Sequence, residues 1–134
     1  MSEYSGVERR KYRRVKVNLT IVYRKNESPN VRIRDDKGEN DAAMVDIGEG
    51  GIAIITTVNV LVGTELLIRF TLVEAAGEKG GFYGDFELLG KVTSNITVDK
   101  DSYRLGIVFL NIDDRIKGNI ANFVNTIESR LQGN

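Results

Sequence analysis

Apolar and polar residues alternate over much of the chain, a period of two that predicts β-strands with one buried face. The alternation is regular at residues 15–23, 66–72 and 103–110. Further apolar stretches bounded by turn residues predict the remaining strands. The predicted strands are 15–23, 42–47, 52–55, 65–72, 86–98 and 103–110, with a further short strand at Val31 and Ile33.

Glycine and polar residues mark the connections between these strands. The segment from Glu74 to Gly84 holds four glycines and no sustained pattern, which predicts a loop. Residues 48–51 predict a tight turn and residues 99–102 a hairpin turn. Within the long strand 86–98, Gly90 predicts a bulge or bend.

The period changes after Asp113. Apolar residues now recur at spacings of three and four, which predicts an amphipathic helix over about 114–131 with Asp113 or Asp114 at its start. The apolar stripe of this helix is Ile116, Ile120, Phe123, Val124, Ile127 and Leu131. We expect the stripe to cap the sheet, and a homodimer or partner face stays open as an alternative.

Six or seven antiparallel strands followed by one helix predict a protein dominated by β-structure. Closure into a small barrel is the economical arrangement, because it leaves no exposed strand edge. The length of 134 residues suits a single domain. We expect residues 1–7 to be a flexible N-terminus and residues 8–131 to form that domain.

Composition narrows the function. The 19 basic and 19 acidic residues balance, which excludes a general polyanion binder that works by bulk charge. The chain has no Cys and no His, which removes disulfides, thiolate zinc sites and the commonest general base. We therefore expect no enzyme activity, no metal site and no cofactor. No secretion signal and no apolar run of membrane length is present, so we expect a cytoplasmic protein.

Positive charge is concentrated in residues 8–14, which hold five basic residues and one acidic residue. Arg10 and Arg14 are four residues apart, as are Arg9 and Arg13. In an extended chain such pairs point to the same side, about 13 Å apart. Two guanidinium groups at this spacing suit the two ends of one anionic ligand, because arginine binds phosphate or a guanine edge through paired hydrogen bonds. A solvated basic tail is the simpler alternative.

The second candidate feature is the turn from Asp46 to Gly51 between two predicted strands. An aspartate at a strand end can accept hydrogen bonds from the N1–H and N2–H groups of guanine. Glycines let a backbone approach a ligand closely. A plain turn, with Asp46 bonded to its own backbone, is the alternative explanation.

Together these features resemble the PilZ domain family, bacterial receptor modules for cyclic di-GMP. The segment from Arg10 to Arg14 is similar to the family's RxxxR motif, and that from Asp46 to Gly51 to its [D/N]xSxxG motif. The segment from Tyr103 to Phe109 is similar to its late R-x-G-V-x-F strand. The likeness covers roughly residues 8–131. It implies a six-stranded antiparallel β-barrel with a C-terminal α-helix, acting as a non-catalytic receptor for cyclic di-GMP.

The resemblance also implies roles for single residues. Arg10 and Arg14 are expected to bind phosphate and guanine with help from Arg9 or Arg13, Asp46 to hold a guanine edge, and Gly51 to permit close approach. Gly48 departs from the family's Ser, and the missing hydroxyl is expected to lower affinity about tenfold or more. The predicted ligand-binding residues are Arg9, Arg10, Arg13, Arg14, Asp46, Gly48 and Gly51.

We expect the arginine-rich segment to fold over the bound nucleotide and so to change the surface that an unidentified protein partner meets. Two alternatives stay open. One is a barrel that has lost its ligand and acts only through protein–protein contacts. The other is a barrel that binds single-stranded nucleic acid, with Phe82, Tyr83 and Phe86 as a stacking platform. For these aromatic residues, core packing with one exposed tyrosine is the simpler expectation.

Overall fold

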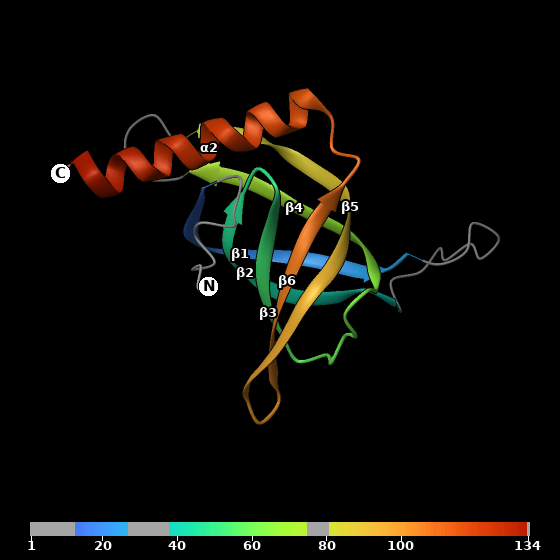
Figure 1. Ribbon diagram of the computed structural model, residues 1–134. Coiled ribbons are helices and arrows are strands. Elements are labelled where there is room, and N and C mark those ends of the chain that lie inside the picture. The colour runs from blue at the N-terminus through green and yellow to red at the C-terminus, as the bar shows by residue number, and fades with distance from the viewer. Residues whose placement is uncertain (1–12, 27–37, 75–80, 134) are drawn as a thin grey trace, which may run out of the picture.

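The computed structural model describes residues 13–26, 38–74 and 81–133 (Figure 1). Its six strands are antiparallel and form a closed barrel in the order β1-β2-β3-β6-β5-β4. The strands are β1 (Arg14–Lys25), β2 (Asn40–Gly48), β3 (Gly51–Thr56), β4 (Glu65–Glu74), β5 (Gly81–Asp99) and β6 (Ser102–Leu110). The predicted barrel is confirmed. The strand predicted at Val31 and Ile33 and the flexible N-terminus at 1–7 lie outside the described residues.

The barrel interior is filled by the apolar residues that alternate inward along each strand. Burying each such side chain stabilises the fold by about 1.5–3 kcal/mol. The largest fully buried side chains are Tyr23, Phe123, Ile21, Met44, Ile47, Ile52, Ile54, Leu66, Ile68, Leu72, Leu105 and Ile107. Tyr23 brings a hydroxyl into this core, where it is 2.7 Å from Oγ1 of Thr56. Burial raises the pKa of Tyr23, and the hydrogen bond with Thr56 partly offsets that effect.

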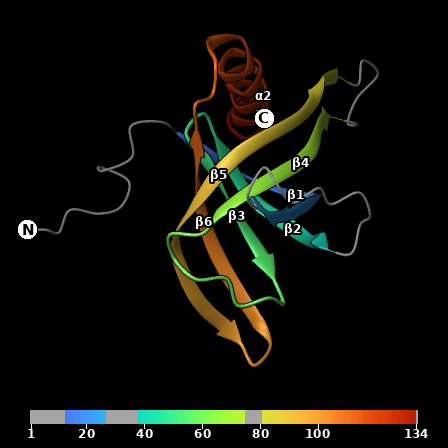
Figure 2. The same ribbon diagram turned by 90° about the vertical axis from the view of Figure 1, so that its right-hand side faces the viewer.

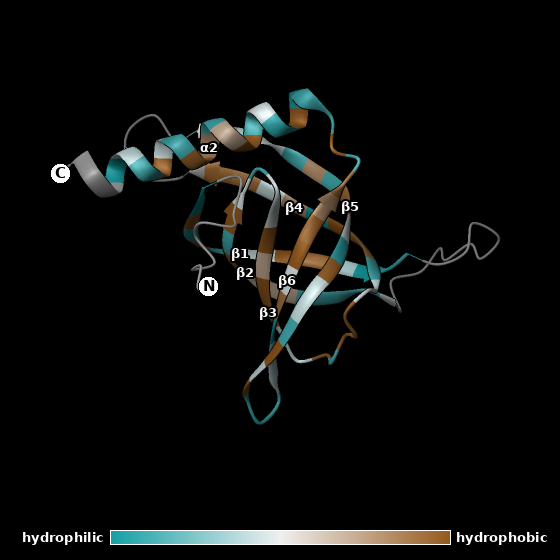
Figure 3. Ribbon diagram, viewed as in Figure 1, coloured by the Kyte–Doolittle hydropathy of each residue, from teal (hydrophilic) through white to brown (hydrophobic). Residues whose placement is uncertain are grey.

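One end of the barrel is covered by α2 (Asp114–Gly133), and the β5–β6 hairpin extends from the opposite end (Figures 1 and 2). The carboxylate of Asp113 accepts a hydrogen bond from the backbone N–H of Ile116 at 2.8 Å, which identifies Asp113 as the N-cap. Ile120, Phe123 and Val124 are buried against the barrel core. Figure 3 shows apolar and polar residues mixed along α2, as the predicted amphipathic cap requires. Among the described residues, no helix is both long and apolar enough to cross a membrane.

Three local predictions for β5 are wrong. Residues 81–84 were expected in a loop, but they form the start of β5 because they pair with β4. Tyr83 is an extra residue in this pairing, and the resulting bulge lets its ring pack edge-on against Phe123 of α2. The exposed aromatic residue is therefore Phe82, at 67% exposure, and not the tyrosine. Since Phe86 is buried, these three residues form no stacking platform.

The third correction concerns Gly90, which lies in regular register between Leu66 and Phe109 and not at a bulge. A Cβ atom at this position would lie 2.5 Å from Cγ2 of Ile107 and 3.0 Å from Cδ1 of Ile68. Gly90 therefore makes room for core side chains of two neighbouring strands.

Candidate ligand-binding site

The register of the sheet places Arg14, Gly48, Gly51 and Val108 in one row across β1, β2, β3 and β6. Residues opposite one another on neighbouring strands share a face of the sheet. Val108 is exposed, so this row lies on the outer face of the barrel. Arg14 thus stands at the edge of a surface whose next two positions carry no side chain.

These two glycines leave space for the Arg14 side chain. A Cβ atom at Gly48 would collide with the backbone oxygen of Arg13 and lie 2.8 Å from Cγ of Arg14. A Cβ atom at Gly51 would collide with the backbone oxygen of Ile107 and lie 3.1 Å from Nη2 of Arg14. Neither glycine has a positive φ, so the requirement is for space and not for backbone conformation. In this structure the group that closely approaches Gly51 is Arg14.

The next outer row contains Lys16, Asp46, Ala53 and Gly106. Asp46 reaches this face because of a bulge in β2. Met44 opposes Ile54 and Asp46 opposes Ala53, so one extra residue lies between the two pairs. In a regular strand Asp46, two residues after Met44, would share the inward direction of Met44. The bulge therefore moves the carboxylate from the core to the outer surface.

Asp46 is 8% exposed and binds two arginines, one through each carboxylate oxygen. Nη1 of Arg14 lies 3.1 Å from Oδ1, and Nη2 of Arg104 lies 2.9 Å from Oδ2. Such charge-assisted hydrogen bonds are stronger than neutral ones, and they orient the carboxylate. Two cations on one carboxylate also leave the cluster net positive, which favours an anion on this surface.

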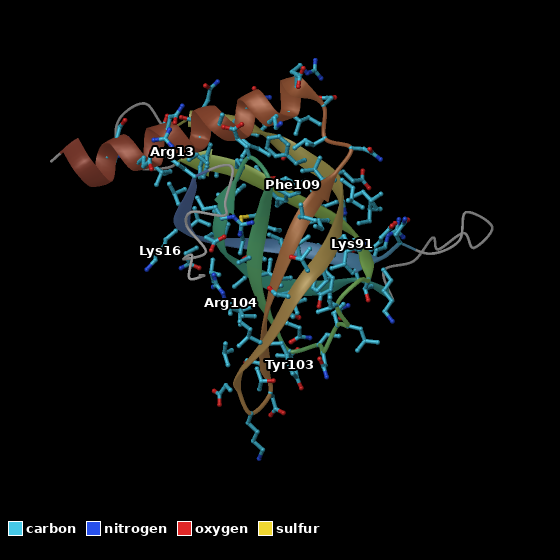
Figure 4. All side chains as sticks on the ribbon, in the orientation of Figure 1. Arg13, Lys16, Lys91, Tyr103, Arg104 and Phe109 are labelled. Atoms are coloured by element: carbon cyan, nitrogen blue, oxygen red, sulfur yellow. The ribbon has the colours of Figure 1, made fainter. Side chains whose placement is uncertain are left out.

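Further cations lie around this cluster. Lys16 on β1 and Lys91 on β5 are exposed at the two ends of these rows. In Figure 4 the labels of Lys16 and Arg104 lie on one side of β6 and that of Lys91 on the other. The two rows between them carry a floor of small residues, Gly48, Gly51, Ala53 and Gly106, together with Asp46 and the exposed Val108. This arrangement suits a flat anionic ligand, because small residues permit close approach and guanidinium groups bind phosphate and stack on rings.

Arg13 points away from this surface. Its guanidinium group donates to Oδ1 of Asn125 at 2.8 Å and forms an ion pair with Oε1 of Glu128 at 2.6 Å, both on α2 (Figure 4). The structure thus brings together Arg14, Asp46, Gly48 and Gly51 of the predicted site and places the Arg13 side chain against α2. Arg9 and Arg10 lie outside the described residues. The ligand contacts of all seven stay predictions.

Arg104 was not among the predicted site residues. Inward-facing Tyr103 and Leu105 flank it, so alternation alone indicates that Arg104 faces outward. Its partner was hidden, because Asp46 lies 58 residues earlier and reaches the same surface only through the bulge in β2.

A surface groove of about 550 Å³ lies elsewhere, between β1 and β4. It forms because these strands pair only from Val22 to Lys25, and Leu19, Phe70 and Phe86 are among its lining residues. The arginine cluster is not part of it. We place the candidate site at the cluster, because a flat glycine floor can hold a planar ligand without being hollowed. No group of acidic side chains suited to a metal ion occurs in the described part of the chain.

Comparison with protein families gives one match, in which the model of the PilZ domain matches residues 8–126. This range includes all three motif segments and all six strands. A comparison with curated protein sequences finds no match.

Several solved structures share the fold. The chain is similar to the Bacillus subtilis inhibitor of motility MotI/DgrA, with a TM-score of 0.69 and 13% identity over 92% of this chain and 53% of that one. It is similar to the PilZ domain with c-di-GMP of YcgR from Escherichia coli, with a TM-score of 0.62 and 16% identity over 93% and 95%. The K. pneumonia MrkH–c-di-GMP complex gives 0.60 and 14% over 93% and 54%. The chain thus spans about half the length of MotI/DgrA and MrkH.

Proposed function

The chain belongs to the PilZ domain family, and on that premise we propose that it is a non-catalytic receptor for cyclic di-GMP. The observation that carries the proposal is the arrangement of Arg14, Asp46 and Arg104 over a glycine floor. Two structures of the same fold, from YcgR and MrkH, are described as complexes with c-di-GMP. Cyclic di-GMP offers two phosphates and two guanine bases, which complement this surface in charge and shape.

The proposed contacts follow from the chemistry of each side chain. Arg14 binds a phosphate or the acceptor edge of guanine through two parallel N–H donors. Asp46 accepts the N1–H and N2–H groups of a guanine. Gly51 and Gly48 provide the floor on which the ligand lies, and Arg10, four residues before Arg14 in the sequence, adds a second arginine.

The guanidinium group of Arg14 and the N1–H/N2–H edge of guanine are both planar and both present two neighbouring N–H donors. Arg14 therefore occupies at Asp46 the place that a guanine takes on binding. Ligand binding is an exchange in which Arg14 turns from the carboxylate to the nucleotide.

The same exchange can transmit the binding signal to α2, where a protein partner would meet it. Arg13 precedes Arg14 in the chain and holds Asn125 and Glu128 of α2. If the backbone of Arg14 shifts toward a ligand, it carries Arg13 with it and disturbs these contacts, because the two residues are adjacent in the chain. The surface that changes for a protein partner is therefore α2 and its junction with the arginine-rich segment.

A second candidate is a PilZ barrel that has lost its ligand and works through protein contacts alone. Two observations favour it. Gly48 lacks the hydroxyl of the family's Ser, and both oxygens of Asp46 are already bound to arginine. In this case the arginine cluster is a structural clamp between β1, β2 and β6.

Titration calorimetry with cyclic di-GMP, GTP and a short single-stranded oligonucleotide distinguishes the candidates. The receptor proposal predicts saturable binding of cyclic di-GMP and much weaker binding of GTP. The oligonucleotide is expected to give only weak, strongly salt-dependent binding. The contrary result is that cyclic di-GMP, at high protein concentration, gives no heat of binding and no competition with the other two ligands. That result contradicts the receptor proposal and supports the ligand-free barrel.

A further inference from the structure

Arg104 occupies a different structural position from Arg14, although both bind Asp46. Arg14 is the first residue of β1 and, among the described strands, pairs only with Gly48 of β2. Arg104 lies inside β6 and pairs with Ile55 on one side and Ile96 on the other. A residue paired on both sides is held by the sheet, whereas a residue at a strand start can move with its chain end. Of the two arginines, Arg14 is the one free to turn toward a ligand.

When Arg14 turns away, the carboxylate of Asp46 still needs a cationic partner. Asp46 is 8% exposed, and a carboxylate this buried is destabilised when its partner is removed. Within the described parts of the chain, the second cation bound to Asp46 is Arg104, 2.9 Å from Oδ2, and it can meet this need. A carboxylate has about four lone-pair positions on its two oxygens. Asp46 can therefore keep the bond to Arg104 and still accept two N–H groups from a planar donor.

We propose that Arg104 is a positioning residue of the ligand site, which keeps the Asp46 carboxylate paired and oriented while the Arg14 side chain moves from Asp46 to the nucleotide. This inference rests on the proposed cyclic di-GMP function. According to this inference, the preference for guanine depends on two residues together, Asp46 and Arg104, which lie in neighbouring outer rows of the barrel. Arg104 acts through Asp46 on the guanine and takes no part in the exchange itself.

The first test compares Arg104→Gln and Arg104→Lys with the wild type, using cyclic di-GMP and its analogue with hypoxanthine bases, which lack the N2 amine. Arg104→Gln is expected to weaken cyclic di-GMP binding about tenfold, the effect of losing one charge-assisted hydrogen bond. It should also reduce the preference for guanine over hypoxanthine. Arg104→Lys should restore affinity in part, because the cation is kept while the planar fork is lost. The matched control is Arg115→Gln, an exposed arginine of α2, which should bind as the wild type does.

The base preference separates positioning from a general structural role, since a loosened barrel weakens both ligands alike. Equal affinity and equal base preference in Arg104→Gln and the wild type would overturn the inference while leaving the receptor function intact. If the wild type binds neither ligand, the receptor function has failed, and a second measurement decides the role of Arg104.

This second measurement needs no ligand. The loss of Tm caused by Arg104→Gln is compared between Asp46 and Asp46→Asn proteins, with and without Arg14→Gln. We expect a larger loss when Asp46 is present, and a larger difference still when Arg14 is absent, because Arg104 is then the remaining partner in the cluster. Equal losses in all backgrounds would show that Arg104 does not hold Asp46.

Discussion

The inner and outer faces of β2, β3 and β6 differ in almost every respect, although they alternate along the same strands. The inner row of Ile47, Ile52 and Ile107 is made of large, branched side chains that are at most 1% exposed. The adjacent outer row carries Asp46, Ala53 and Gly106, one charge beside two small residues. Large side chains fix the barrel, and small ones leave its outer surface open to arginines and, as we propose, to a nucleotide.

The comparison predicts that substitutions on the two faces have separable effects. The largest is expected for Ile52→Ala on the inner face, where a fully buried side chain leaves a cavity. The free energy of unfolding should fall by about 2–5 kcal/mol. Urea denaturation measures this change, and calorimetry on the protein that stays folded should give an unchanged Kd for cyclic di-GMP. A weakened Kd in that folded fraction would mean that the two faces are coupled.

On the outer face, Arg14→Ala should cost about 2–4 kcal/mol of binding free energy, the range for an anchoring residue. The fold should survive, because Asp46 keeps its contact with Arg104. Calorimetry and a thermal melt on the same sample give both quantities. Unaltered affinity would remove Arg14 from the site.

Gly48→Ser tests whether the outer face tolerates a larger side chain. The substitution restores the family's hydroxyl beside Arg13 and Arg14. The new Cβ would collide with the backbone oxygen of Arg13. We therefore expect a loss of about 1–3 kcal/mol of stability, typical of overpacking, and no gain in affinity. A mutant that is as stable as the wild type and binds more tightly would show that the start of β1 moves away from Gly48 when ligand binds.

The smallest effect is expected far from both faces, at Gly118 on α2. This glycine is exposed, and a Cβ atom there meets nothing within 4 Å. Gly118→Ala should raise the free energy of unfolding by about 0.5–1 kcal/mol, because alanine favours helix. Denaturant unfolding and calorimetry together should show a more stable protein with unchanged affinity. A change in affinity would indicate that helix stability is linked to the site.

The inner face was largely predictable from sequence, and the outer face was not. Alternation at residues 15–23 and 103–110 and the change of period after Asp113 predict the strands and the capping helix, because burial imposes a strict period. The orientation of Asp46 depends on the bulge in β2, a single extra residue that no period reveals. The prediction of where β5 starts was wrong for the same reason, because its glycines and the bulge at Tyr83 obscure the alternation.

The arginines show where sequence reasoning ends. Arg13 and Arg14 are neighbours in a basic run, yet one binds α2 and the other binds Asp46. Successive residues of an extended chain point to opposite sides. Spacing therefore predicts that Arg13 and Arg14 point in different directions, but it does not predict which residues they contact. The contact of Arg104 with Asp46 depends on the register of three strands, which sequence pattern does not fix.

Amide chemical-shift mapping with cyclic di-GMP tests the central claim most directly, because it reports on both faces and on the β1–β4 groove in one titration. The account predicts the largest shifts at Arg14, Asp46, Gly51, Gly106 and Arg104, with smaller shifts along α2 near Asn125 and Glu128. Residues lining the groove, such as Thr20 and Asp85, should stay unshifted. Shifts confined to the groove, or none at saturating ligand, would contradict a nucleotide site on the glycine floor.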